Sequence, residues 1–305
     1  MTAPVGGRRP LYDRVAEETA GVVIRRYSTS FGLASRLLGR GVRRHVENIY
    51  ALVRVADEIV DGGAAESGAD ADATATILDD FESATERAVE IGFSANLVVH
   101  AFALTARSVG IGSDLTRPFF ASMRADLTDV VHDRRSFDEY VYGSAEVVGL
   151  MCLRAFLADG AGGTTASSRT ETDAAALVTG ARRLGAAFQK VNFLRDLAAD
   201  FEELGRSYFP DVDVASFDEP AKIRILDDID ADLRASAQVI PMLPRSSRRA
   251  VLLAQGLFVE LSRRLRATPA DRLVRTRVRV PDAVKLRIAA SAAVGRPTAV
   301  ARVGA

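Results

Sequence analysis

The sequence predicts an all-α protein, and three observations support this fold class. Apolar residues recur with the 3.6-residue period of a helix through most of the 305-residue chain, and alternating strand-like runs are nearly absent. Alanine, the strongest helix former, is frequent, and tryptophan is absent. Hydrophobic residues make up 48% of the chain, which is enough for a large core.

Ten helices are expected from this period. Three of them have capping signals at their starts: Ser94 for the fourth, Ser136 with Glu139 for the sixth, and Thr170 with Asp173 for the seventh. The expected ranges are 11–26, 42–61, 71–91, 94–109, 115–132, 137–158, 170–203, 220–239, 246–267 and 281–293.

Glycine-rich and small-residue segments separate these helices. Residues 62–72 are expected to form an exposed loop, 160–169 a flexible connector, and Gly205 the end of the longest helix. Small residues, Gly and Pro predict a frayed tail at 291–305. The connector could separate two domains. We expect one domain over the whole chain, with an ordered core at about 10–293, because chemically related acidic segments lie on both sides of it.

The composition excludes several functional classes. Forty basic residues balance 40 acidic ones, so a nucleic-acid partner is not expected. The single cysteine, Cys152, rules out an intrachain disulfide, and its apolar neighbours predict a core residue rather than a nucleophile. No HExxH, GxSxG, Walker or strand-borne GxGxxG motif is present. No apolar run approaches 18 residues, so we expect no spanning helix and a cytoplasmic protein.

The first acidic segment covers residues 54–61. Asp57 and Asp61 are four residues apart, which places them on one face of a helix, about 6 Å apart along its axis. Like charges at this spacing repel each other, and the flanking residues are apolar. The two carboxylates are therefore costly unless cations neutralise them.

The second acidic segment, residues 189–200, repeats this spacing with Asp196 and Asp200. Asn192 and Gln189 extend the same polar stripe on an otherwise apolar helix. Oxygen-rich sites of this kind suit Mg²⁺, with Mn²⁺ as an alternative. A single DxxxD would normally be a solvated helix face, but two copies in apolar helices favour a metal-binding role.

At these segments the sequence resembles the squalene/phytoene synthase family, the head-to-head trans-isoprenyl diphosphate synthases. The likeness runs from about residue 20 to 290 and is greatest to bacterial phytoene synthases. The segments that carry it are 27–31 (YSTSF), 49–61 (IYALVRVADEIVD), 120–127, 142–149, 189–200 (QKVNFLRDLAAD), 205–210 (GRSYFP) and 277–281 (RVRVP). Glu58 stands where many members have a second Asp, Tyr27 where some have His, and Phe258 where some have Tyr.

The resemblance implies an isoprenoid synthase fold, a single helical bundle around a deep apolar cavity. It implies that the metal ligands are Asp57, Asp61, Asn192, Asp196 and Asp200, the four aspartates being catalytic. It implies that the residues binding the substrate are Ser28, Ser30, Arg54, Gln189, Asn192, Arg195, Arg206, Tyr208 and Arg277. For Arg206 and Arg277 the alternative is a surface salt bridge.

The reaction implied by the resemblance is that of phytoene synthase. Two geranylgeranyl diphosphates would condense head to head, with Mg²⁺, through prephytoene diphosphate to phytoene. The alternatives are a squalene or dehydrosqualene synthase using farnesyl diphosphate, of which only the squalene synthase would need NADPH, and a non-catalytic helical partner of the same fold. The last should have lost its acidic ligands, and here all four aspartates are present.

The partners follow from this reaction. They are isoprenyl diphosphates, together with peripheral contact at the inner face of the membrane for release of a hydrophobic product. The arginine-rich segment 244–266 is a candidate for that contact, and a solvated helix face is the alternative. The sequence does not predict an oligomeric state.

Overall fold

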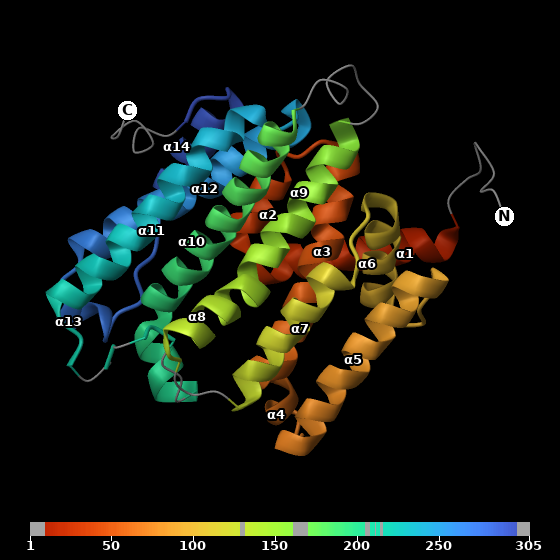
Figure 1. Cartoon of the computed structure of the whole chain (residues 1–305), viewed down its shortest axis with the longest axis horizontal. Coiled ribbons are helices and arrows are strands. Elements are labelled where there is room, and N and C mark those ends of the chain that lie inside the picture. The colour runs from red at the N-terminus through yellow and green to blue at the C-terminus, as the bar shows by residue number, and fades with distance from the viewer. Residues whose placement is uncertain are drawn as a thin grey trace.

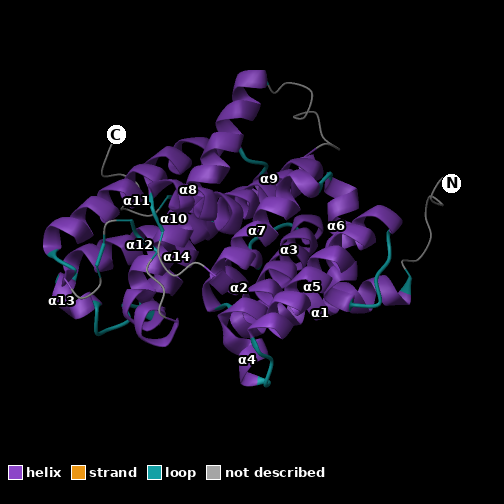
Figure 2. Ribbon diagram, turned by 60° about the horizontal axis from the view of Figure 1, so that its bottom comes forward, coloured by secondary structure: helices purple, strands orange, loops and turns teal. Residues whose placement is uncertain are grey.

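The computed structural model describes residues 10–128, 132–160, 170–204, 208–210, 212–213 and 216–297. Within these residues the chain is helical and contains no strand, as Figure 2 shows. The α-helices are α1 (Leu11–Tyr27), α2 (Thr29–Ser35), α3 (Arg40–Glu58), α4 (Ala64–Glu66), α5 (Ala71–Ile91), α6 (Leu97–Val109), α7 (Ser113–Thr128), α8 (Arg134–Val141), α9 (Val147–Gly160), α10 (Glu171–Leu204), α11 (Glu219–Val239), α12 (Arg245–Ala267), α13 (Ala270–Leu273) and α14 (Asp282–Ala293). The predicted fold class is confirmed.

The helices form one bundle around the long helix α10 (Figure 1). Helix α10 packs against α9, α11 and α12, and α3 packs against α1, α6 and α9. Helices α5, α6 and α7 lie toward one end of the molecule in Figure 1, and α11, α12 and α13 lie toward the other. Helices α9 and α10 therefore lie between these two ends and pack against each other.

Two large apolar clusters stabilise the bundle. One joins α10, α11 and α12 around Phe193, Leu226 and Leu265. The other joins α3, α5, α6, α7 and α9 around Phe102 and Phe120. Burying each such side chain contributes roughly 1.5–3 kcal/mol, so these clusters determine which helices lie beside each other.

A π-helical turn, η1 (Ile59–Gly63), follows α3 and corrects the prediction of an exposed loop from residue 62. Gly62 has φ 116°, a left-handed conformation that glycine adopts readily, and the chain re-enters a helix at α4 two residues later. Only Ser67 to Asp70 separate α4 from α5.

A second π-helical turn, η2 (Tyr142–Glu146), divides the expected helix 137–158 into α8 and α9. The predicted cap at Ser136 is wrong. The Asp133 side chain caps α8 by accepting a hydrogen bond from the backbone N–H of Ser136 at 2.7 Å. The helix therefore starts one turn earlier than expected, because Asp133 and Ser136 are both good capping residues and lie only three positions apart.

The predicted cap at Ser94 is also wrong, since Asn96 accepts hydrogen bonds from the N–H groups of the first turn of α6. The reciprocal cap at Thr170 and Asp173 is confirmed, with two hydrogen bonds of 3.1 Å. Helices α2 and α13 and the 3₁₀ turn η5 (Ile240–Met242) were not predicted from the sequence. Gly205, most of the 160–169 connector and the last residues of the tail lie outside the described residues.

By length and hydropathy alone, the stretch Arg134–Asp159 could cross a membrane. In the bundle it packs against α3, α7 and α10, and part of its surface is buried by them. Its apolar composition is accounted for by this packing and by the cavity described next.

Candidate active site

A cavity of about 1170 Å³ runs between α2, α3, α9, α10 and α12. Its wall changes character along each helix. On α3 the lining residues run from Val46 and Ile49 to Asp57, and on α10 they run from Leu177 to Asp196. The cavity therefore has a carboxylate-rich end and a long apolar part. Its size exceeds that of most pockets for drug-sized ligands, which are about 300–1,000 Å³.

Asp57 lies at the C-terminal end of α3, and Asp61 lies in η1. Both line the cavity, but the π-helical turn between them replaces the regular α-helical stacking expected from their spacing. Burial, followed by the nearby charges of Asp61 and Asp126, raises the pKa of Asp57 to about 7. The first acidic pair is thus a concentration of negative charge that a cation would relieve.

Asp126 of α7 is a further acidic residue of the site, and no sequence motif assigned it a role. It is buried, and the Tyr140 hydroxyl donates to its carboxylate at 2.8 Å from either oxygen. The hydroxyl of Tyr208 donates to Asp126 Oδ1 at 3.2 Å, and the Tyr208 ring stacks on Phe193 at 3.9 Å. Tyr208 thus lies in the predicted site, with its hydroxyl directed to a carboxylate. The sequence offers no paired spacing around Asp126, because the other charged residues of α7 are Asp114, Arg117 and Arg124.

Asp196 of α10 is held by two arginines. Arg277 Nε lies 2.8 Å from Oδ1 and Arg277 Nη2 lies 3.2 Å from Oδ2. The adjacent Arg195 also contacts both carboxylate oxygens, with Nε 3.0 Å from Oδ1. Arg277 therefore forms a salt bridge in the structure, and its partner is a predicted metal ligand rather than a surface residue.

Arg54, the arginine of the first motif, has different partners. Its guanidinium contacts Glu58 and lies over the Tyr27 ring, 4.6 Å from the ring centroid. Ser28, a predicted substrate contact, caps α2 by accepting a hydrogen bond from Phe31 N at 3.0 Å. Phe258 stacks on Phe188 at 3.9 Å in the cavity wall, where a tyrosine would have offered a hydroxyl.

The lining of one cavity includes eleven of the predicted site residues. These are Ser28, Ser30, Arg54, Asp57, Asp61, Gln189, Asn192, Arg195, Asp196, Tyr208 and Arg277. Asp200 belongs to α10 but its side chain is outside the described part of the structure, as is the whole of Arg206. The catalytic and binding roles assigned to these residues stay predictions.

The donor atoms at this end of the cavity are carboxylate and amide oxygens, which suit Mg²⁺. Asp57, Asp61, Asp196 and Asn192 could hold such ions, and Asp126 adds a carboxylate beside them. In the described residues no three His, Cys, Asp or Glu side chains already converge on a single point. A diphosphate bridging the two motifs would supply further oxygen ligands.

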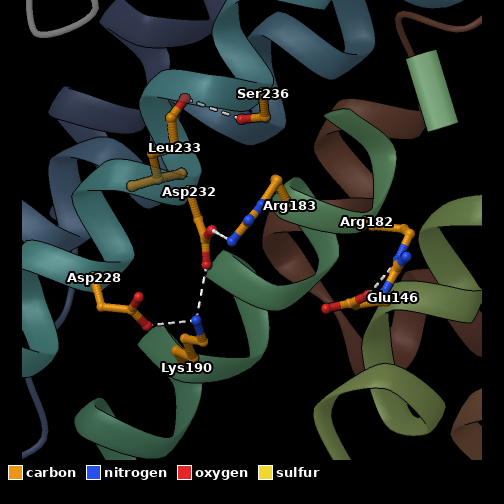
Figure 3. A network of polar contacts seen from close by, with 8 residues as sticks. All are labelled: Glu146, Arg182, Arg183, Lys190, Asp228, Asp232, Leu233 and Ser236. Atoms are coloured by element: carbon orange, nitrogen blue, oxygen red, sulfur yellow. Dashed lines mark hydrogen bonds and ion pairs between the residues drawn. The ribbon is translucent and has the colours of Figure 1, made fainter. Parts of the chain in front are cut away.

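An ion-pair network around the buried carboxylate of Asp232 fixes α10 on the side facing α11 (Figure 3). Lys190 Nζ donates to Asp228 Oδ2 at 2.5 Å and to Asp232 Oδ2 at 2.8 Å, and Arg183 binds the other oxygen of Asp232 at 2.8 Å. Gln189 is next to Lys190 in sequence and lines the cavity. The network therefore sets the rotation of α10 that points its polar stripe into the cavity.

Cys152 lines the apolar part of the cavity, and burial raises the pKa of its thiol to about 12. A thiol with that pKa stays protonated near neutral pH, so it is a poor nucleophile. The sequence predicts a core residue at this position, whereas the structure places Cys152 half-buried in the cavity wall, packed against the second apolar cluster.

A helical bundle with two carboxylate motifs at one end of a deep apolar cavity defines the isoprenoid synthase class, and comparison with known proteins specifies the family. The family model for squalene/phytoene synthase matches residues 24–283. The chain belongs to the squalene/phytoene synthase family, whose members are prenyltransferases.

Named relatives support this assignment. The chain is 28% identical over 293 residues to a phytoene synthase of Mycobacterium bovis, covering 88% of each chain. It is 32% identical over 200 residues to phytoene synthase 3 of Zea mays, covering 65% of this chain and 43% of the relative. The chain thus spans less than half the length of this maize relative.

Solved structures share the fold. A dehydrosqualene synthase in complex with a ligand superimposes with a TM-score of 0.73 at 19% identity, covering 92% of this chain and 96% of that one. A squalene synthase from Alicyclobacillus acidocaldarius has a TM-score of 0.68 at 19% identity, covering 86% and 98%. The predicted isoprenoid synthase architecture is confirmed.

Proposed function

We propose that this protein is a phytoene synthase, which condenses two geranylgeranyl diphosphates head to head. The observation that carries the proposal is the single cavity, acidic at one end and apolar along the rest, lined by both aspartate motifs and by Arg195 and Arg277. Such a cavity suits a substrate with a charged diphosphate head and a long hydrocarbon tail.

Different residues of the chain would bind the diphosphate, hold the metal and exclude water. Arg195 and Arg277 would orient the diphosphate through the planar fork of donors of each guanidinium. Magnesium held by Asp57, Asp61, Asn192, Asp196 and Asp200 would neutralise the diphosphate as it leaves. The apolar wall, including Leu177 and Phe188, would exclude water, which would otherwise quench an allylic cation.

The reaction would proceed in two stages. In the first, the C1–O bond of one substrate breaks, the double bond of the other attacks, and proton loss gives the cyclopropyl intermediate prephytoene diphosphate and free diphosphate. In the second, the remaining diphosphate leaves, the carbon skeleton rearranges, and a proton is lost to give phytoene. Stabilising the developing charge on each leaving diphosphate is the main catalytic demand.

The choice of C20 over C15 substrates rests on the named relatives. The proteins that are 28–32% identical to this chain are phytoene synthases. The dehydrosqualene and squalene synthases share the fold at 19% identity, so they do not indicate the substrate. A farnesyl diphosphate-dependent enzyme is therefore the second candidate.

Product analysis tests the proposal. The purified protein, incubated with Mg²⁺ and either geranylgeranyl or farnesyl diphosphate, is expected to form a C40 hydrocarbon from the former in preference to any C30 product from the latter. Asp57→Asn and Asp196→Asn should each reduce turnover at least 100-fold without unfolding the protein, since each removes a charge that the reaction needs. A C30 product alone would identify the second candidate, and no hydrocarbon from either substrate would leave the non-catalytic alternative.

A further inference from the structure

The two acidic motifs differ in how their charges are compensated. Asp196 has both carboxylate oxygens engaged by guanidinium groups of Arg195 and Arg277. At the other motif, burial raises the pKa of Asp57, and the charge of Arg54 lowers it only in part. The Arg54 guanidinium contacts Glu58 and lies over the ring of Tyr27. The electron pairs that Asp196 would offer a metal are therefore already shared with arginine hydrogens.

We propose that Arg277 restricts metal binding at Asp196 until a diphosphate arrives and draws this arginine away. The inference deepens the proposed function and rests on it, because it assumes that Asp196 binds a metal ion. The order of events follows from it. Metal binding at the Asp196 motif is completed only when substrate is present.

The ion pair between Arg277 and Asp196 is weak enough to be broken when a ligand binds. The Arg277 side chain is 54% exposed and that of Asp196 19% exposed, so water screens the pair. Ion pairs of this exposure are worth about 1 kcal/mol or less. A diphosphate carries more negative charge than one carboxylate and can accept both donors of the guanidinium fork, so it should compete effectively for Arg277.

The backbone around Arg277 allows the exchange with little rearrangement. Residues 276–281 have no regular hydrogen-bonded structure, so no helix has to unwind. Val280 is buried and Val278 packs against the same apolar cluster, and these contacts anchor the segment beside α10. Because Arg277 also lines the cavity, rotation of its side chain can carry the guanidinium from Asp196 to a ligand.

The proposal predicts effects of opposite sign on two ligands. Removing Arg277 should make the metal bind more tightly in the absence of diphosphate, because only Arg195 then competes with the metal for the Asp196 carboxylate. The same change should weaken the binding of diphosphate, because a positive partner is lost. Loss of structure at the site would weaken both, so the pair of measurements separates this role from a merely structural one.

The test uses Mn²⁺ and inorganic pyrophosphate as probes with the full-length protein, and electron paramagnetic resonance reports the free Mn²⁺. Relative to the wild type, Arg277→Gln should bind Mn²⁺ about threefold to fivefold more tightly without pyrophosphate, equivalent to about 1 kcal/mol or less. It should bind pyrophosphate about tenfold more weakly. Pyrophosphate should also enhance Mn²⁺ binding less in this variant than in the wild type, since the coupling between two ligands is reciprocal.

Further variants test whether the change in Mn²⁺ affinity comes from the contact between Arg277 and Asp196. Arg275→Gln removes an exposed arginine from the same segment, outside the cavity lining, and should leave both affinities within about twofold of the wild type. Adding Asp196→Asn to Arg277→Gln should cancel the gain in Mn²⁺ affinity. If Arg277→Gln does not fold, Arg277→Lys should give a gain of the same sign, because an ammonium lacks the planar fork of a guanidinium.

Unchanged or weaker Mn²⁺ binding in Arg277→Gln would overturn the inference. If the proposed function itself is wrong, the wild-type protein gives a different result. A wild-type protein that binds no Mn²⁺ even with pyrophosphate would show that the acidic motifs are not metal sites at all.

Discussion

Asp57 is held in an environment that opposes its ionisation. Its pKa is raised from 3.8 to about 7, mainly by burial and then by Asp61. A carboxyl whose pKa is higher in the folded state binds its proton more tightly there. In the absence of metal, its contribution therefore destabilises the fold progressively from about pH 4 to 7, and fully above pH 7.

Asp57→Asn should consequently stabilise the metal-free protein at pH 8 by about 1–2 kcal/mol, less than the full pKa shift implies because the carboxyl faces a cavity that water can enter. The gain should shrink at pH 5. Urea unfolding at the two pH values with a chelator present measures this difference. A variant that is destabilised equally at both pH values would contradict the prediction.

Lys222, near the start of α11, carries a buried ammonium that lies beside the end of α12. Its Nζ donates to the carbonyl oxygens of Thr268 at 2.6 Å and Arg266 at 3.3 Å, and it lies 2.7 Å from a carboxylate oxygen of Glu219. Three donors arranged around one nitrogen fit three acceptors that a planar guanidinium would not match. Lys222 thus joins the start of α11 to the end of α12.

Lys222→Met should lower the free energy of unfolding by about 2–3 kcal/mol, because it leaves buried carbonyl groups without donors. Lys285→Met is the matched control, since Lys285 pairs with the 91% exposed side chain of Asp282. Its effect should stay below about 0.5 kcal/mol. If urea denaturation showed the same loss of unfolding free energy for both variants, the prediction that burial makes Lys222 more important would be wrong.

At the scale of elements, the two π-helical turns determine the geometry of the site. Turn η1 contains Asp61, and η2 follows directly after the helix that carries Tyr140, the hydrogen-bond donor to Asp126. Both turns pack against α7. Single π-helical turns inside helices occur often at functional sites, where they redirect side chains.

Gly143 shows how tightly η2 meets α7. A Cβ at this position would lie 2.2 Å from the backbone oxygen of Pro118 and 2.1 Å from Ser122 Oγ. Gly143→Ala should therefore cost about 1–3 kcal/mol in stability, because the Pro118 backbone cannot move aside cheaply. Activity should fall as well, since Tyr140 and Asp126 would shift.

The control for Gly143→Ala is Gly21→Ala in α1. There the nearest atom to a new Cβ is the mobile end of Arg25, 3.0 Å away. Alanine favours a helix interior over glycine by about 1 kcal/mol, so this variant should be neutral or more stable in thermal unfolding. Opposite signs for the same substitution are the expected outcome, and destabilisation of both would contradict it.

At the scale of the whole molecule, sequence periodicity predicted the long helices well. The expected ranges 71–91 and 220–239 agree with α5 and α11 to within a residue. Turn η2 was not predictable, because the helical pattern of 137–158 continues through it, whereas Gly62 and Gly63 in η1 did indicate a break, which was interpreted as a loop. Helix α2 was missed since it is only seven residues long.

The sequence predicted the site only where the same acidic spacing occurs twice. The DxxxD pairs are visible as spacing, whereas Asp126 is a single acid whose neighbours at the site come from other helices. The partnership between Arg277 and Asp196 joins residues 81 positions apart, so no local pattern could indicate it. Long-range pairing of this kind requires the folded chain.

The scarcity of lysine gives the molecule an unusual chemical surface. The chain has 37 arginines and three lysines, and the side chains of Lys190, Lys222 and Lys285 are 11%, 2% and 23% exposed. Lys190 and Lys222 lie in the contacts of α11 with α10 and α12. An amine-directed reagent should therefore label these two positions only when α11 separates from its neighbours. Their acylation rate would be a built-in reporter of how often this half of the bundle opens.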